Sequence, residues 1–119
     1  MSSRQTGLIE VALPVPLFQT FTYELNADAR IPAPGSRVVV PFRNRKEIGI
    51  CLGAFDGTAP KRIKRVIEVP DDSPALSENL IALCRWIADY YIVPLGVVMR
   101  SALPAALTGA GARIGRVGE

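Results

Sequence analysis

The chain has 119 residues, of which 49% are hydrophobic, and a formal net charge of +3 at pH 7. This length and composition fit one domain that buries a core without disulfide or metal staples, and they exclude a disordered chain. No apolar run approaches the ~20 residues needed to cross a bilayer, and the N-terminus lacks the apolar segment of a signal peptide, so we expect a cytoplasmic protein with no membrane partner.

Two extended runs within residues 8–25 are predicted as half-buried strands. Apolar and polar side chains alternate in both runs, which is the period of a strand with one buried face. The prolines between the runs donate no backbone hydrogen bond and therefore belong at an edge or a crossover. The second run turns Phe21 and Tyr23 toward the core, and we expect a ligand on its polar face, around Thr22.

Three further strands are predicted between residues 36 and 69. Arg37–Phe42 is nearly all apolar, and Glu47–Phe55 alternates large apolar with small residues, which lets a strand bend sharply. The hairpin between them is expected to place Asn44 in a left-handed conformation, and Lys64–Val69 forms a last strand that can pair across the sheet. Short links favour antiparallel pairing in a small barrel or strongly twisted sheet of about five to six strands.

The periodicity becomes helical in the C-terminal third of the chain. Ser77 is expected to cap a helix of about four turns, and Pro94 begins a second, shorter helix that ends before Pro104. Trp86 and Tyr90 lie four residues apart on the first helix, and we expect this pair to dock the helix on the barrel rather than to stack on a base. The predicted fold class is therefore α+β, a small sheet or barrel followed by two C-terminal helices.

The C-terminal residues and the two cysteines are the remaining features of the sequence that bear on domain organisation and chemistry. Residues 105–119 are rich in Ala and Gly and are predicted as a linker or tail to downstream domains, which leaves residues 1–104 as the domain. Cys51 and Cys84 lie in a strand-like and a helix-like run, in a chain without histidine. Reduced, buried thiols are favoured over a disulfide or a metal site.

No catalytic motif is present in the sequence. The chain has no histidine, no phosphate-binding loop of the GxxxxGK[ST] type, no GxGxxG and no GxSxG. Asp71 and Asp72 are the sole adjacent carboxylates, and they lie in a turn, where acids serve turn and cap geometry. We therefore expect a binding protein rather than an enzyme, with no catalytic residue, metal ligand or cofactor in this chain.

Positive charge is concentrated in residues 43–65, which hold seven basic and two acidic side chains, a net charge of +5. The basic side chains form two groups, 43–46 and 61–65, that a hairpin would bring together. Such a patch suits a polyanion, and a solvated, solubilising surface is the alternative on charge alone. The basic residues are Arg43, Arg45, Lys46, Lys61, Arg62, Lys64 and Arg65.

Five segments carry a resemblance to a known family, and three patterns within them, VALPVPL, RVxVPF and ADYY…PxG…ALP, are not those of generic strands or helices. The five segments are VALPVPL at 11–17, TFTY at 20–23, PGSRVVVPF at 34–42, IGI at 48–50 and WIADYYIVPLGVVMRSALP at 86–104. In this order and spacing they resemble the N-terminal DNA-binding domain of the PriA family of primosomal replication-restart helicases. The resemblance implies a small β-rich fold with helices that binds the 3′ end of the nascent leading strand at a stalled fork. It also implies ATP and zinc only in the helicase lobes and zinc-binding insert that follow this domain in the family.

The same resemblance points to a pocket and to two departures from the family pattern. Phe21 matches the aromatic residue whose backbone faces the terminal base, and Lys64 matches the lysine of the pocket. Thr22 stands where the family commonly has an acid that reads the base edge, and Arg43 stands where it commonly has glycine. A hydroxyl lacks the fixed acceptor pair of a carboxylate, so we expect weaker or different base readout, while Arg43 adds a group that can hold a phosphate.

These observations assign expected roles. Phe21 and Tyr23 frame the pocket, Thr22 bonds the base or sugar, and Lys64 and Arg43 take phosphates. Sequence-independent electrostatic attraction is expected from Arg45, Lys46, Lys61 and Arg62.

The expected partner is DNA with a free 3′ end at fork structures. Through the full-length helicase, other primosome proteins and single-stranded DNA-binding protein are expected as well, in the bacterial cytoplasm at the nucleoid. The alternative is a protein-interaction module whose basic face docks an acidic partner or the other domains of the helicase.

Overall fold

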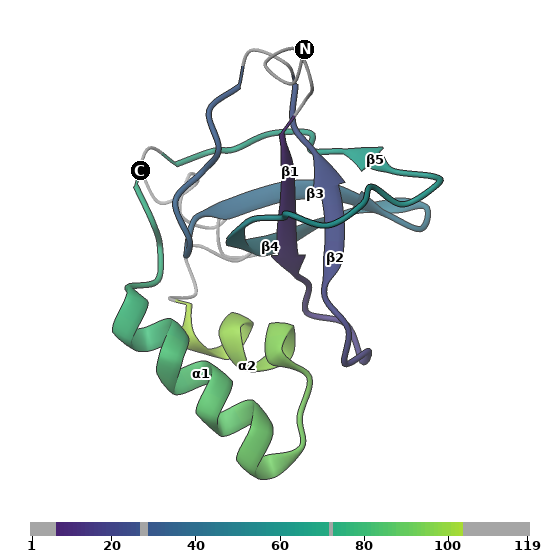
Figure 1. Ribbon diagram of the computed structural model, residues 1–119. Helices are drawn as coiled ribbons and strands as arrows, with labels where there is room; N and C mark the ends of the chain where they lie inside the picture. Colours follow the sequence, from purple (N-terminus) through teal and green to yellow (C-terminus); the bar gives the residue numbers. More distant parts are fainter. Residues whose placement is uncertain (1–6, 27–28, 72, 104–119) are drawn as a thin grey trace, which may run out of the picture.

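The computed structural model describes residues 7–26, 29–71 and 73–103 (Figure 1). Within them, five strands form a single sheet in the order β3-β4-β1-β2-β5, and two helices pack at one end of it. The elements are β1 (Leu8–Ala12), β2 (Phe21–Glu24), β3 (Arg37–Phe42), β4 (Arg45–Ala54), β5 (Lys64–Arg65), α1 (Glu78–Tyr91) and α2 (Leu95–Ala102). The predicted α+β class is confirmed, and the predicted linker at 105–119 lies outside the described residues.

The sheet curls because β4 is bent along its length. A side chain at Gly49 would place its Cβ 2.5 Å from Val11 Cγ1, so only glycine lets β1 approach this closely. Gly53 has a φ of +124°, and the register between β1 and β4 shifts between Glu10 and Val11. The small residues predicted to let this strand bend therefore do so, and the sheet forms a half-barrel (Figure 1).

The two edges of the sheet are joined by the chain that begins with β5. Lys64 pairs with β2, and four residues later Glu68 bridges Val39 of β3, with hydrogen bonds of 2.8 Å from Val39 N to Glu68 O and from Ile67 N to Val39 O. The expectation of antiparallel pairing throughout is wrong for β5, which runs parallel to β2. The β3–β4 hairpin lies between these two strands in the sequence, and so long a connection permits a parallel arrangement.

Two apolar clusters form the core. One fills the inside of the curled sheet, and the other lies between the sheet and the helices. Cys51 belongs to the first cluster and Cys84 to the second, and both are buried free thiols, as predicted. At the second cluster a Cβ on Gly96 would lie 1.8 Å from the carbonyl oxygen of Leu13. Glycine at this position therefore lets α2 rest directly on the backbone that leaves β1.

The outward face of α1 carries aromatic side chains that were expected to be buried. The cap is as predicted, since Ser77 Oγ accepts a hydrogen bond of 3.1 Å from Leu80 N. Trp86 and Tyr90, however, are 58% and 66% exposed, and their rings stack on each other with centroids 5.0 Å apart. The docking prediction is wrong because α1 packs through the narrow stripe of Ile81, Cys84 and Ala88, which lies on the opposite side of the helix.

This arrangement predicts different costs for two truncations in the helical part. Met99→Ala empties a fully buried site and should lower the free energy of unfolding by about 2–5 kcal/mol. Trp86→Ala removes an exposed ring and should cost less than about 1 kcal/mol. Urea denaturation followed by circular dichroism measures both, and equal losses would contradict the assignment of the buried helix face.

A partly buried ion pair ties β3 to the chain before α1. Arg37 Nε and Nη2 lie 2.6 and 2.7 Å from Asp71 Oδ2 and Oδ1, which is a bidentate geometry. The hydrogen bond from Arg37 lowers the pKa of Asp71 below its ordinary value. The sequence had suggested turn geometry for Asp71, so its role as a charge partner is a correction; Asp72 lies outside the described residues.

Asp71→Asn should lower the free energy of unfolding by about 2 kcal/mol at neutral pH, because the mostly buried Arg37 would lose its bidentate bond to a carboxylate. A depressed pKa in the folded state stabilises the fold above the pKa of the unfolded chain, and this stabilisation is lost as the pH falls through the folded value. The difference between the two proteins should therefore shrink below about pH 4. A difference independent of pH, measured by denaturation from pH 7 to pH 2, would contradict the pairing.

Candidate nucleic-acid interface

An open depression of about 400 Å³ lies beside β2. We call it the β2 hollow. Three segments distant in sequence form its walls: residues 19–23, residues 41–43 at the end of β3, and residues 60–64 before and in β5. The lining residues are Gln19, Thr20, Phe21, Thr22, Tyr23, Pro41, Phe42, Arg43, Pro60, Arg62 and Lys64.

Tyr23 holds these walls in place. Its side chain is 4% exposed, and its hydroxyl donates a hydrogen bond of 2.8 Å to the carbonyl oxygen of Pro41 in β3. In the sheet it pairs with Lys64 of β5. Burial, with a smaller contribution from the charge of Glu47, raises the pKa of Tyr23 to about 12. The hydroxyl therefore remains a donor at neutral pH, and Tyr23 connects all three walls.

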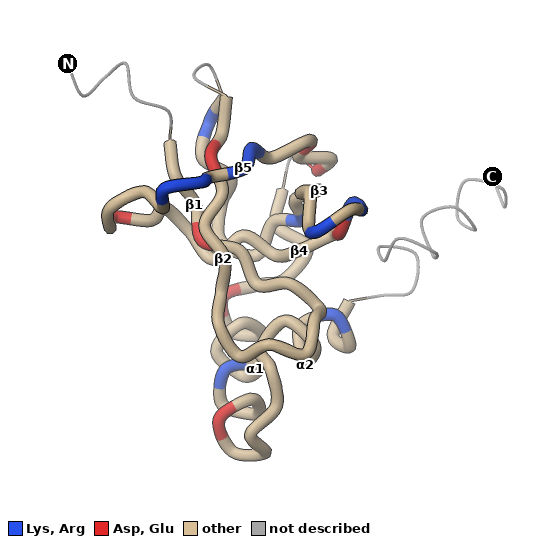
Figure 2. The backbone as a smooth tube through the Cα atoms, turned by 90° about the vertical axis from the view of Figure 1, so that its right-hand side faces the viewer, with Lys and Arg blue, Asp and Glu red and all other residues tan. Residues whose placement is uncertain are grey.

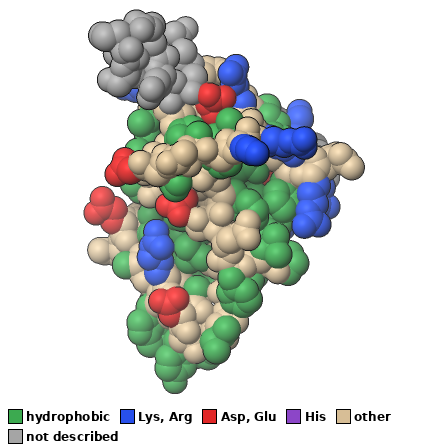
Figure 3. Space-filling view, turned by 45° about the vertical axis from the view of Figure 1, so that its right-hand side comes forward, with side chains coloured by type: hydrophobic (Ala, Val, Ile, Leu, Met, Phe, Trp, Pro, Cys, Tyr) green, Lys and Arg blue, Asp and Glu red, His purple; other side chains and the backbone are tan. Residues whose placement is uncertain are grey.

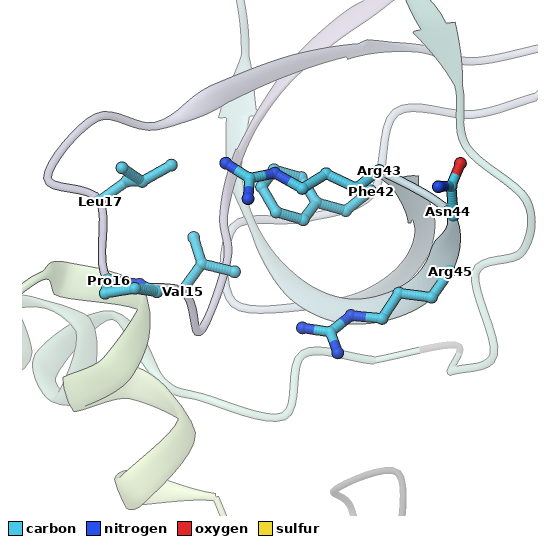
Figure 4. Close-up of a pocket in the computed structure, with 7 residues that line it drawn as sticks. All are labelled: Val15, Pro16, Leu17, Phe42, Arg43, Asn44 and Arg45. Atoms are coloured by element: carbon cyan, nitrogen blue, oxygen red, sulfur yellow. The ribbon is translucent and has the colours of Figure 1, made fainter.

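Two aromatic rings and a guanidinium form the rim between β2 and the β3–β4 turn. Phe21 and Phe42 meet edge to face with ring centroids 5.3 Å apart, and both pack against the inner core cluster. The guanidinium carbon of Arg43 lies 5.2 Å from the centroid of Phe42, across whose ring the side chain extends (Figure 4). This cation–π contact orients an otherwise exposed side chain.

The turn that carries Arg43 has an unusual backbone. Arg43 has a φ of +57°, whereas Asn44, for which the left-handed conformation was predicted, has no positive φ. A positive φ at the first central residue alone is the pattern of a type II′ hairpin turn, which favours glycine there. The β3–β4 hairpin is thus confirmed, with the strained residue one position earlier than expected.

Thr22 lies on the polar face of β2, half-buried, and lines the hollow between Phe21 and Tyr23. Its cross-strand partner in β1 is Glu10, whose carboxylate accepts a hydrogen bond from the hydroxyl of Thr20. The hydroxyl-bearing face therefore extends from Thr22 to Thr20. Thr20 was not among the predicted site residues, although its position two residues from Thr22 on the same face of the run was a usable signal.

The predicted basic residues divide into three groups. Arg43, Arg62 and Lys64 line the β2 hollow, and none of the described residues in its lining is acidic. Arg45 borders a neighbouring depression and forms an ion pair of 2.9 Å with Glu47. Lys46 and Lys61 are exposed and border neither depression.

Most of the described basic residues lie in the sheet part of the molecule, several of them around β5 and the β3–β4 turn (Figure 2), whereas apolar side chains dominate the helical end (Figure 3). Both basic groups of the sequence contribute to the lining of the hollow, the first through Arg43 and the second through Arg62 and Lys64. Across the described part of the chain, no three His, Cys, Asp or Glu side chains gather as a metal site would need. None of the helices in that part has the length and apolar character of a membrane span.

Arg43→Gly should raise the free energy of unfolding by about 1 kcal/mol, because glycine adopts a positive φ without strain. Asn44→Gly is the matched control in the same turn, and it should not stabilise, because the backbone of Asn44 is already in a region that any residue adopts. Thermal and urea denaturation of both variants measure the effect. An Arg43→Gly protein less stable than the Asn44→Gly protein would contradict the turn assignment.

Comparison with known proteins identifies relatives over most of the chain. Residues 10–104 match the family of domains described as the 3′DNA-binding domain (3′BD) of PriA. The replication restart protein PriA of Buchnera aphidicola (subspecies Acyrthosiphon pisum) is 34% identical over 106 residues, which cover 84% of this chain and 14% of that protein. The PriA proteins of Rickettsia conorii and Treponema pallidum are each 31% identical over 82% of this chain. The chain spans 14 to 16% of the length of these three relatives.

Proposed function

Because the chain belongs to the family of PriA 3′DNA-binding domains, we propose that it binds the 3′-terminal nucleotide of a nascent strand at a stalled replication fork. The domain itself is non-catalytic and DNA-binding. In this proposal it serves a longer restart helicase by placing that enzyme at the end of the leading strand, and other primosome proteins and single-stranded DNA-binding protein are reached through the same longer protein.

The observation that carries this proposal is the composition of the β2 hollow. Three cationic residues, Thr22 and partly buried aromatic residues line one depression, and none of the described residues that line it is acidic. A phosphate is attracted by the cations, and a sugar or base edge can bond to the hydroxyl, which both donates and accepts. Phe21 and Tyr23 supply the frame rather than a stacking platform, because their rings face the core.

Selectivity for a strand end is proposed to come from the shape of the hollow. Residues 60–64 border one side of the hollow and the β3–β4 turn borders another. In this proposal these two borders leave no path for a strand that continues past the terminal sugar. A free 3′ hydroxyl is proposed to bond beside the half-buried Thr22, whereas a 3′ phosphate is too bulky for that position. Base identity contributes little in this proposal, because Thr22 offers one hydroxyl where a carboxylate would offer two fixed acceptors.

Titration of labelled oligonucleotides with a 3′ hydroxyl or a 3′ phosphate tests the proposal. The 3′ hydroxyl form should bind at least about tenfold more tightly, and log affinity should fall against log salt with a slope of about −0.7 per contacted phosphate. Lys64→Gln should weaken binding about tenfold, because a cation in the lining is lost.

Lys61→Gln is the matched control. It removes the same charge as Lys64→Gln, but from a residue three positions earlier that is exposed and does not line the hollow. It should weaken binding less than about threefold through the general field alone. Equal effects of the two variants would refute the placement of the site at Lys64. Weak binding with equal affinities for the 3′ hydroxyl and 3′ phosphate oligonucleotides would favour the alternative role, in which the basic face docks an acidic protein.

A further inference from the structure

A second depression of about 460 Å³ adjoins the β2 hollow. We call it the loop hollow, because the β1–β2 loop forms one of its walls and the β3–β4 turn forms the other (Figure 4). Phe42 and Arg43 line both depressions, so the two are contiguous across the side chain of Arg43. The lining residues of the loop hollow are Val15, Pro16, Leu17, Phe42, Arg43, Asn44 and Arg45.

The loop wall has a defined backbone conformation. Val15 N donates to Leu13 O and Leu17 N donates to Val15 O, both at 2.8 Å, so each bond closes a three-residue γ-turn around a proline. Proline restricts φ to the range that an inverse γ-turn uses. The first of these turns begins at Leu13, whose backbone is held by close contact with Gly96 of α2. The apolar wall is therefore formed before any ligand binds.

The opposite wall is cationic. The guanidinium groups of Arg43 and Arg45 both extend from the turn toward the loop, one across the ring of Phe42 and the other toward Val15 (Figure 4). Glu47 contacts Arg45 at Nε, 2.9 Å away, which orients the guanidinium without entering the lining of the hollow. None of the described residues in the lining is acidic, so Arg43 and Arg45 are the charged groups among them.

We propose that the loop hollow binds the nucleotide that precedes the terminal one, so that the domain holds a dinucleotide across Arg43. The inference rests on the proposed function of the β2 hollow and extends it by one nucleotide. Arg43 borders both depressions and takes the phosphate that joins the two nucleotides, and Arg45 takes the next phosphate. Val15, Pro16 and Leu17 contact the face of the second base.

The chemistry of the two walls fits this ligand class. A planar guanidinium binds a phosphate through two parallel hydrogen bonds, which fixes the backbone of the strand without reading its sequence. An apolar surface accepts the face of any base, so contact with Val15 and Leu17 is equally indifferent to sequence. A strand end of arbitrary sequence is therefore the ligand that the two hollows together would take.

Affinities for thymidine 5′-monophosphate and for the dinucleotide pTpT, measured by calorimetry or NMR titration at one salt concentration, test the proposal. The wild-type domain should bind the dinucleotide at least about tenfold more tightly than the mononucleotide. Arg45→Gln should remove most of this gain while leaving mononucleotide affinity within about twofold, because Arg45 does not line the β2 hollow.

Lys46→Gln is the matched charge control. It removes one positive charge from the adjacent residue, which is exposed and lines neither hollow, and it should leave the gain from the second nucleotide intact. Leu17→Ser tests the apolar wall without a change in charge and should reduce the gain as well. Equal effects of Arg45→Gln and Lys46→Gln, or an unchanged gain in Leu17→Ser, would overturn the proposal.

Failure of this inference can be distinguished from failure of the proposed function. If the mononucleotide binds, Lys64→Gln weakens it, and the second nucleotide adds no affinity, then only the second subsite is wrong. If the folded wild-type domain binds neither probe and shows no preference between longer oligonucleotides with different 3′ groups, both proposals fail.

Discussion

The structure depends on closure of a strongly curled sheet. In sheet order β3 and β2 are separated by β4 and β1, yet Val39 of β3 bonds to the chain that continues from β5, and Tyr23 of β2 bonds to Pro41 of β3. Both contacts require the bend that Gly49 and Gly53 permit in β4. Without that bend the three walls of the β2 hollow would lie on distant parts of an open sheet. The site is therefore a product of closure rather than of any single strand.

In the closed sheet, different residues supply the rigid frame of the site and its positive charge. The frame consists of buried groups, namely the ring of Tyr23 and the edges of the inner core cluster, together with a loop that two γ-turns and the contact at Gly96 hold in place. The cations stand on exposed positions around this frame. An exposed side chain retains rotamer freedom, so it can follow a flexible backbone, while the buried frame keeps the depression open.

The sequence predicted those features that follow from local periodicity. Alternation identified the strands and their buried faces, and the side chain of Ser77 identified the start of α1, because burial and capping act over a few residues. The parallel pairing of β5 and the ion pair between Arg37 and Asp71, which are 34 residues apart, depend on closure and leave no local pattern. The aromatic residues of α1 misled the prediction, because Trp86 satisfies a helical period whichever face the helix buries.

The site shows the same division between local and long-range information. Thr22, Arg43 and Lys64 were expected to lie together, and the structure places all three in the lining of one depression, although their contacts with DNA stay a prediction. The loop hollow was not foreseen, because Leu17 and Arg45 are brought together only by the curl of the sheet.

Arg43 is the position where local backbone preference and the proposed function disagree. We expect its positive φ to cost about 1 kcal/mol, which glycine would avoid. The conformation of the turn therefore does not account for arginine at this position. Among the described residues, Arg43 is the one cationic residue that borders both depressions, and its contact with Phe42 orients its side chain. Residues that depart from local conformational preference occur most often at functional positions, where the side chain is needed for binding or catalysis. The resemblance implies an acid at position 22 and a glycine at position 43, and this chain has Thr22 and Arg43 there. In the proposed site we therefore expect a preference for the phosphates of a strand over the edges of its bases.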